Sequence, residues 1–142
     1  MAISQSIKDL IELAWADGHV CLLGTAGADG PNISPKGSMI FFDDDHLAYW
    51  ERSKRKALEN LGSSKRVVVV YSNMHGQREG RVESPVLRFY GTAEIHESGP
   101  IKDAIFSKLL KREQEHDGAD KGLGVLIKIE RAETVGGKSI RR

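Results

Sequence analysis

The feature of the sequence that most constrains the fold is an alternation of apolar and polar residues in residues 86–97. Leu87, Phe89, Ala93 and Ile95 would point to one face of a strand, with mostly polar residues between them. Five further segments have the length and composition of strands. The predicted strands occupy residues 19–25, 31–42, 46–51, 65–73, 86–97 and 124–135. Because long helices do not alternate with them, these strands predict a mainly β, antiparallel, six-stranded small barrel with peripheral helices.

Three segments carry helical signals and would pack around this barrel. Apolar residues recur at helical spacing in the first of them, where Ser4 or Ser6 can cap the start and Gly18 ends the helix. Pro100 and Gly118 would bound the third. The predicted helices occupy residues 4–18, 53–61 and 98–116.

The composition is that of an ordinary globular domain. Lysine and arginine number 21 and aspartate and glutamate 20, so the net charge of +1 provides no general attraction to nucleic acid or to a membrane surface. No apolar run approaches the length of a membrane span. We therefore expect one cytoplasmic domain over residues 1–142, with an N-terminal helix in 1–18 and a C-terminal tail in 136–142. Its single cysteine, Cys21, lies in an apolar run and is expected in the core.

Positive charge is concentrated at the predicted start of the second helix. Arg52, Lys54, Arg55 and Lys56 surround Ser53, the natural N-cap. Each cation near a helix N-terminus is unfavourable by roughly 0.3–1 kcal/mol at low salt. A bound anion would reverse this effect, and free amides, a hydroxyl and cations together suit a phosphate. The alternative is a solvated basic face without a ligand.

The segment "PNISPKGS" is an unusual strand for the same reason. Lys36 is followed by Gly37, which allows close approach of a backbone, and by Ser38, which supplies a hydroxyl. Pro31 and Pro35 cannot donate hydrogen bonds to a neighbouring strand, which indicates an edge or a bulge. The alternative is an edge strand protected by proline and lysine. The two unusual segments support each other, because their cations can converge on one dianion.

Tyr49 and Trp50 come just before the basic cluster and have two interpretations. They can pack on the ring system of a ligand, or they can fill the core or a dimer interface. Other chemistry finds little support. The five histidines show no metal-ligand spacing, and no nucleophile elbow, phosphate-binding loop or dinucleotide fingerprint is present.

Several pieces of the sequence resemble one family in their order and spacing. They are "DGPNISPKGS", "KALENL" followed by a basic pair and a valine run, and "GTAEIHESGP" opening a helix. Together they resemble the pyridoxamine 5′-phosphate oxidase-related family of FMN-binding split barrels, especially its small bacterial FMN-binding members. The resemblance extends from about His19 to Val135, nearly the whole chain.

The resemblance implies a homodimer with FMN in clefts between the subunits. The flavin phosphate would be held by the second strand and by the start of the helix after the third. Ala57 stands where relatives often have threonine or serine, so one phosphate hydroxyl is missing; either Ser53 substitutes or the affinity is lower. The implied cofactor-binding residues are Lys36, Gly37, Ser38, Tyr49, Trp50, Glu51, Ser53, Arg55, Lys56, Ala57 and Asn60. No catalytic residue is identified.

The resemblance implies flavin redox chemistry with a nicotinamide donor and an acceptor that the sequence does not name. The chain ends before the segment that binds the pyridoxal substrate in longer oxidases, so vitamin oxidase activity is not expected. Three alternatives stay open: a non-catalytic FMN-binding or electron-transfer protein, a split barrel that binds deazaflavin or haem, and a dimer without cofactor. Haem would need an axial histidine, for which His75 and His96 are the candidates.

Overall fold

The computed structural model describes residues 3–52, 56–82, 84–116 and 121–140. Its main element is one seven-stranded antiparallel sheet with the strand order β2-β1-β5-β6-β7-β4-β3. The fold class is therefore confirmed, with seven strands in place of six. The strands are β1 (Cys21–Gly27), β2 (Gly30–Lys36), β3 (Ile40–Asp43), β4 (His46–Glu51), β5 (Arg66–Ser72), β6 (Val86–His96) and β7 (Leu123–Thr134).

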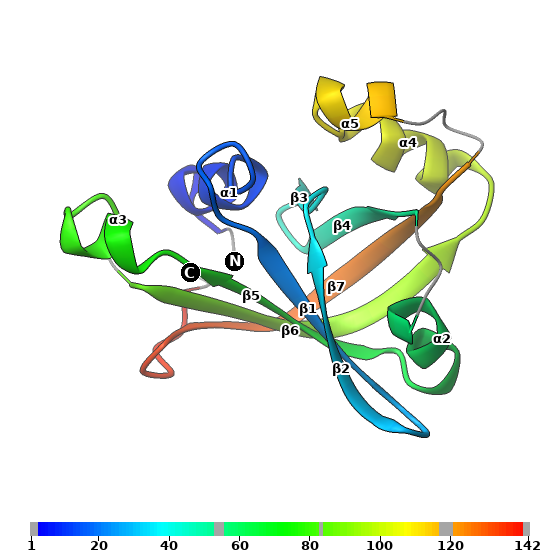
Figure 1. The fold of residues 1–142 in the computed structure, drawn as a ribbon, viewed down its shortest axis with the longest axis horizontal. Coiled ribbons are helices and arrows are strands. Elements are labelled where there is room, and N and C mark those ends of the chain that lie inside the picture. Colours follow the sequence, from blue (N-terminus) through cyan, green and yellow to red (C-terminus); the bar gives the residue numbers. More distant parts are fainter. Residues whose placement is uncertain (1–2, 53–55, 83, 117–120, 141–142) are drawn as a thin grey trace.

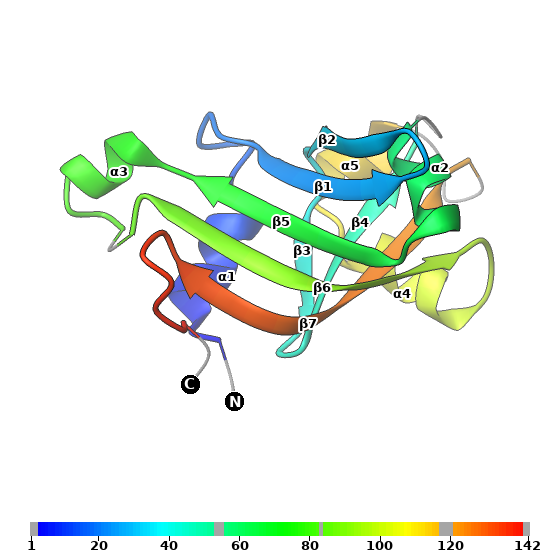
Figure 2. The same ribbon diagram turned by 90° about the horizontal axis from the view of Figure 1, so that it is seen from below.

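The extra strand arises because the predicted strand over residues 31–42 is broken at residues 37–39. Its two halves, β2 and β3, form the opposite edges of the sheet. A link from Lys36 to Ile40 can span at most about 14 Å. The sheet must therefore curl until its two edges lie close together (Figures 1 and 2). This curling produces a barrel that is split between β2 and β3.

The core follows the predicted alternation along the central strands. Strand β5 lies between β1 and β6, and Val67, Val69 and Tyr71 point into the barrel. Val68 and Val70 are half-buried on the opposite face. Cys21 is 1% exposed, which confirms the prediction of a core thiol. Burial raises its pKa to about 12, so the thiol stays protonated at neutral pH.

The helices lie around the barrel but differ from the predicted ones. Helix α1 (Gln5–Glu12) begins at Ser4, whose hydroxyl accepts a hydrogen bond from the Ile7 amide. It ends at Glu12 instead of residue 18, and turns carry the chain on to Gly18, whose φ is +84°. Helix α2 (Lys56–Ser63) packs on β1 beside the β1–β2 hairpin (Figure 1). Its predicted start at residues 53–55 lies outside the described residues.

The third predicted helix is two helices. Helix α4 (Pro100–Lys108) begins at Pro100 as expected and packs on β7. It ends at Leu109, whose backbone is extended with φ −64° and ψ 152°, and α5 (Lys111–His116) follows. The predicted stop at Gly118 lies outside the described residues.

The predicted loop after β5 contains a further short helix, α3 (Met74–Arg78). The Asn73 side chain caps it by accepting a hydrogen bond of 2.8 Å from the Gly76 amide. Among the described residues, every helix is too short or too polar to span a membrane.

Candidate functional site

Lys36, the last residue of β2, points into the protein and forms an ion pair with Glu51 at the end of β4. Its Nζ lies 2.9 Å from Oε2 and 3.2 Å from Oε1 of Glu51. The side chains are only 8% and 2% exposed, respectively. The ammonium also lies 5.2 Å from the centroid of the Tyr49 ring. The predicted phosphate site therefore contains a buried cation that already binds both oxygens of an anionic side chain.

Ser38 lies in the link between β2 and β3 and extends the pairing of β3 with β4. Because Ile40 pairs with Ala48, Ser38 falls opposite Trp50. Its hydroxyl accepts a hydrogen bond of 2.9 Å from the Trp50 amide and donates one of 3.3 Å to the Trp50 carbonyl. The hydroxyl thus takes the place of a backbone partner for β4. Both of its hydrogen bonds are made to the Trp50 backbone.

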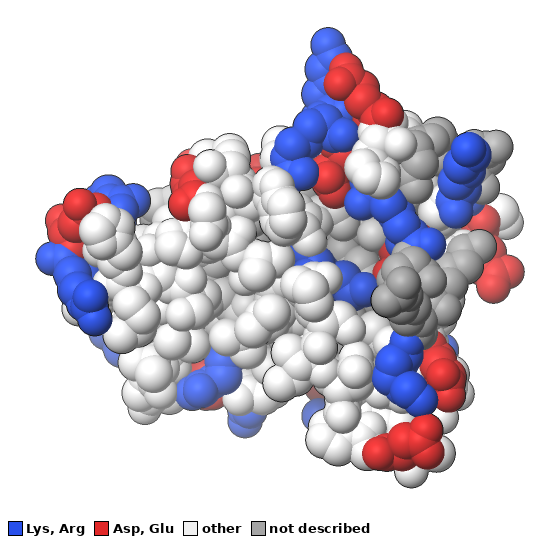
Figure 3. All heavy atoms as spheres, in the orientation of Figure 1, with Lys and Arg blue, Asp and Glu red and all other residues white. Residues whose placement is uncertain are grey.

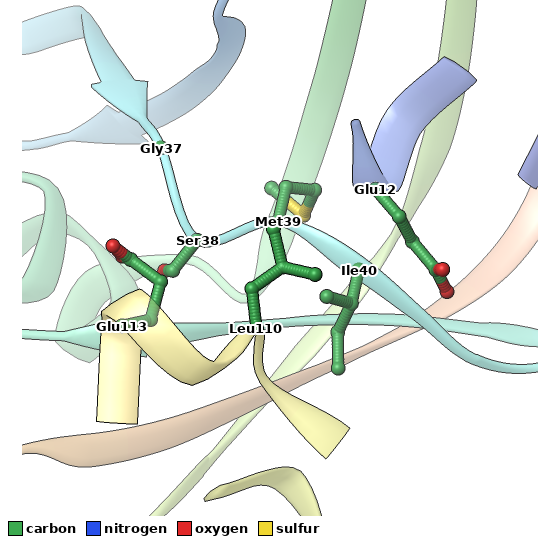
Figure 4. Close-up of a pocket in the computed structure, with 7 residues that line it drawn as sticks. All are labelled: Glu12, Gly37, Ser38, Met39, Ile40, Leu110 and Glu113. Carbon is green, nitrogen blue, oxygen red and sulfur yellow. The ribbon is translucent and has the colours of Figure 1, made fainter. Parts of the chain in front are cut away.

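Gly37 is contacted by Trp15, in the turns after α1, and by Arg112 of α5. A Cβ atom at this position would lie 3.0 Å from the Trp15 ring, and its carbonyl accepts a hydrogen bond of 3.4 Å from Arg112. Figure 4 shows Leu110 and Glu113 facing this link across a pocket that is too tight to admit a water molecule. The Gly37–Ser38 part of the predicted site is therefore closed.

Helix α5 is held over the link by two arginines that bind Glu113. Arg52 Nη1 donates to Glu113 Oε1 at 3.1 Å, and its Nη2 donates to the Glu113 carbonyl at 3.0 Å. Arg112 Nη1 donates to Glu113 Oε2 at 2.8 Å. Glu113 is only 7% exposed. This network fastens α5 to the end of β4 and closes the split of the barrel at that point.

Tyr49 and Trp50 are both core residues, with exposed fractions of 0% and 2%. The Trp50 ring lies 5.1 Å from the Phe106 ring of α4. The Tyr49 hydroxyl and the Trp50 Nε1 are buried and find no hydrogen-bond partner in the part of the chain that the structure describes. Burial raises the pKa of Tyr49, and the charge of Glu51 adds to this effect. Of the two interpretations of this pair, the structure favours the core.

The predicted residues of α2 lie beside the β1–β2 hairpin. Lys56 Nζ lies 3.0 Å from Asp29 Oδ2 and 3.4 Å from Glu59 Oε1, with 40% of the side chain exposed. The hydrogen bond to Asp29, followed by that to Glu59, raises the pKa of Lys56. Ala57 is buried, and Asn60 Nδ2 donates a hydrogen bond of 3.0 Å to Thr25 Oγ1.

The structure brings together only part of the predicted site. Lys36, Ser38, Tyr49, Trp50 and Glu51 meet where β2 ends beside β4. The Lys56 ammonium instead contacts Asp29, just before the other end of β2, about 20 Å along the strand from Lys36. The two cations do not converge on one point. Ser53 and Arg55 lie outside the described residues.

Basic and acidic side chains share the surface between α2 and the helices α4 and α5 (Figure 3). Figure 3 shows lysine and arginine side chains around a hollow on the same side of the molecule as α2, below α4 and α5. A separate groove of about 690 Å³ lies between α1, residues 80–82, Ser84 and residues 138–140. Because none of the predicted cofactor-binding residues lines that groove, it does not belong to this site.

The acidic partners are what sequence reasoning missed. Glu113 lies 61 residues from Arg52, and Asp29 lies 27 residues from Lys56. Asp29 opens the piece "DGPNISPKGS", which gives no sign of its partner, and Glu113 stands in no motif; neither is in a helical pairing with its partner, so no local signal identifies the two pairs. Glu51 was included only as a residue near the flavin, not as the partner of Lys36.

His75 and His96, the candidate axial ligands for haem, are both paired with carboxylates in the structure. His75 lies 3.3 Å from Glu79, and His96 lies 3.2 Å from Glu94. In the described part of the chain, no group of three or more histidine, cysteine, aspartate or glutamate side chains could hold a metal ion.

Comparison with known proteins identifies the family. A family model described as "Pyridoxamine 5'-phosphate oxidase" matches residues 5–136. The chain belongs to this family. None of the curated proteins matches it.

Solved structures of the family share the fold of the chain. HupZ of Group A Streptococcus is 28% identical, with a TM-score of 0.72 over 96% of this chain and 97% of that one. An FMN-binding protein of Syntrophomonas wolfei is 14% identical, with a TM-score of 0.64 over 92% of this chain and 87% of that one. A protein named F420 reductase is 17% identical, with a TM-score of 0.59 over 89% and 94%. The last two likenesses show the split-barrel fold alone.

Proposed function

We propose that this chain is an FMN-binding flavoprotein, a pyridoxamine 5′-phosphate oxidase-like oxidoreductase that takes electrons from a nicotinamide donor. The observation that carries the proposal is the buried ammonium of Lys36 at the predicted phosphate position. It contacts both oxygens of the Glu51 carboxylate. Membership of the oxidase family supports a flavin, and the S. wolfei neighbour of the same fold is an FMN-binding protein.

The residues present fit the phosphate end of FMN better than its ring. Lys36 is a cation surrounded by protein, where charged hydrogen bonds are strong. Lys56 is held only by exposed carboxylates, so its flexible side chain can turn from Asp29 toward a ligand. Tyr49 and Trp50 are covered in the single chain and do not offer a ring face. When bound, FMN would supply the redox chemistry, and this chain's residues would bind and orient it.

The proposal includes a homodimer with the cofactor at the subunit interface. The outer face of the sheet carries a row of paired residues, Ile33, Gly24, Val68 and Tyr90. Ile33 is 70% exposed, and Val68 is half-buried beside it. A second copy packed on this face would bury the row and supply the missing wall for the flavin ring. Light scattering at micromolar concentration is expected to give the mass of two chains, and a monomer would contradict the dimer.

The function is tested by comparing FMN with riboflavin, which lacks the phosphate. Quenching of flavin fluorescence gives both dissociation constants under identical conditions. If the phosphate is bound by Lys36, FMN binds at least about tenfold more tightly than riboflavin, the scale of one charged hydrogen bond. Equal affinities would contradict the phosphate site. Tighter binding of the deazaflavin F420 would move the assignment to that cofactor.

A carrier without turnover is the second candidate. It is favoured because Lys36 and Glu51, the ionisable pair of the site, bind each other, and the Tyr49 hydroxyl is buried. The loaded protein mixed with NADH or NADPH in the absence of oxygen separates the two functions. Loss of the oxidised-flavin absorbance faster than for free FMN supports the oxidoreductase, and an unchanged rate supports the carrier.

A further inference from the structure

The ammonium of Lys36 binds the side chain of Glu51, and another anion can replace this partner. The contact joins two side-chain ends, Nζ of Lys36 and the carboxylate of Glu51. By contrast, the Ser38 hydroxyl bonds to the backbone of Trp50 and could not leave without breaking the pairing of β4. Lys36 is therefore the polar group of this junction that can change partner while the strands stay in place.

Within residues 3–52, 56–82, 84–116 and 121–140, Lys36 is the cation that pairs with Glu51. Arg52, the next residue along the chain, is held by both the carboxylate and the carbonyl of Glu113. The Tyr49 ring lies below the Lys36 ammonium, and its hydroxyl stays protonated because burial raises its pKa. If Lys36 were taken by another anion, Glu51 would have to move toward water or remain as an uncompensated buried charge, which is strongly unfavourable.

We propose that Glu51 is a built-in competitor for Lys36, so that the anionic end of the cofactor binds only by displacing its carboxylate. This inference rests on the proposed function and names the residue that sets specificity at the phosphate end. A phosphate monoester carries a charge of about −1.5 to −2 at pH 7, more than a single carboxylate. It can therefore displace Glu51, whereas a ligand with one negative charge gains nothing by the exchange.

The test is the Glu51→Gln variant, which keeps the shape of the side chain and removes the competing charge. Dissociation constants for FMN and riboflavin are measured by fluorescence quenching in the wild type and in the variant. We expect the preference for FMN over riboflavin to rise at least about tenfold, because Lys36 no longer has an anionic partner to give up. The matched control is Glu59→Gln, which removes an exposed carboxylate from Lys56 and should change the preference less than about threefold.

The possible outcomes separate this inference from the proposed function. If the wild type prefers FMN but Glu51→Gln leaves that preference unchanged or lowers it, Glu51 is not a competitor and the inference fails. If the wild type binds FMN and riboflavin equally, the phosphate site and the proposed function both fail.

A measurement on the wild type keeps the inference testable if Glu51→Gln does not fold. With ¹³C-labelled glutamate carboxyls, one buried signal, assigned through Glu51→Asp, should shift on saturation with FMN and stay in place with riboflavin. A Glu51 signal that does not respond to FMN would overturn the inference.

Discussion

The two lysines predicted to bind phosphate have opposite environments. Lys36 is 8% exposed and contacts both oxygens of the buried Glu51. Lys56 is 40% exposed and contacts Asp29 and Glu59, which are 78% and 69% exposed. A buried pair becomes very unfavourable when one partner is removed, whereas an exposed pair contributes little. The same residue type is therefore held by a buried partner at β2 and by exposed partners at α2.

The largest expected effect on stability is at Lys36, the buried lysine. Lys36→Met should lower the free energy of unfolding by about 3–5 kcal/mol, because Glu51 is left as an unpaired buried charge. The double variant Lys36→Met with Glu51→Leu should recover most of that loss. Urea denaturation measures all three proteins. A single variant as stable as the wild type would show that the pair is not buried in solution.

The Ser38→Ala variant tests whether the Ser38 hydroxyl stabilises the fold. Ser38→Ala leaves the Trp50 amide and carbonyl without their partner, so we expect a loss of about 1–3 kcal/mol in urea denaturation. Ser107→Ala, which removes an exposed hydroxyl bonded to the Asp103 carbonyl, is the control and should cost less. Equal losses in the two variants would contradict the role of Ser38 as a backbone substitute.

Tyr49 should make the stability of the protein depend on pH. Burial raises its pKa, so above the ordinary tyrosine pKa of about 10 the unfolded chain loses this proton while the folded chain retains it. Stability should therefore fall as the pH rises through about 10. Tyr49→Phe should be about as stable as the wild type at pH 7, since the Tyr49 hydroxyl has no partner among the described residues, and should lose less stability at pH 10–11. Thermal melts at both pH values check this, and parallel losses in the two proteins would contradict it.

The smallest effect on stability is expected at the exposed lysine. Lys56→Ala should leave the urea midpoint nearly unchanged, because its partners are exposed to solvent. It should nevertheless weaken FMN binding by roughly tenfold, the loss of one charged hydrogen bond. Lys111→Ala, which removes another exposed helical lysine, is the control. If Lys56→Ala retained the wild-type affinity for FMN, the α2 lysine would not be part of the site.

The comparison also shows how far the sequence predicts this protein. The alternation along β6 and the valine run of β5 are local patterns, and both strands appear where they were predicted. The break at Leu109 was not predicted, although the apolar pattern ends at Leu110 and residues 111–116 are all polar or charged; at Leu109 the backbone turns to an extended conformation. The predicted strand over residues 31–42 is broken because its halves, β2 and β3, lie at opposite edges of one sheet. This arrangement is a property of the whole barrel.

The candidate site, like the fold, could be predicted only in part from the sequence. The unusual lysine of β2 and the cations before α2 were visible as residue types in unfavourable positions. Their partners were not visible, because pairs such as Lys36 with Glu51 and Arg52 with Glu113 form only when distant segments fold together. Sequence patterns therefore located the cations, and only the structure showed which of them already hold an anion.

The measurement that tests the central claim most directly asks whether Lys36 recognises the phosphate of FMN. The ratio of riboflavin to FMN dissociation constants is measured for Glu51→Gln and for the double variant Lys36→Met with Glu51→Gln, so that no unpaired carboxylate complicates the comparison. The account predicts a strong preference for FMN in the first protein and a ratio close to one in the second. An undiminished preference in the double variant would show that the phosphate lies elsewhere.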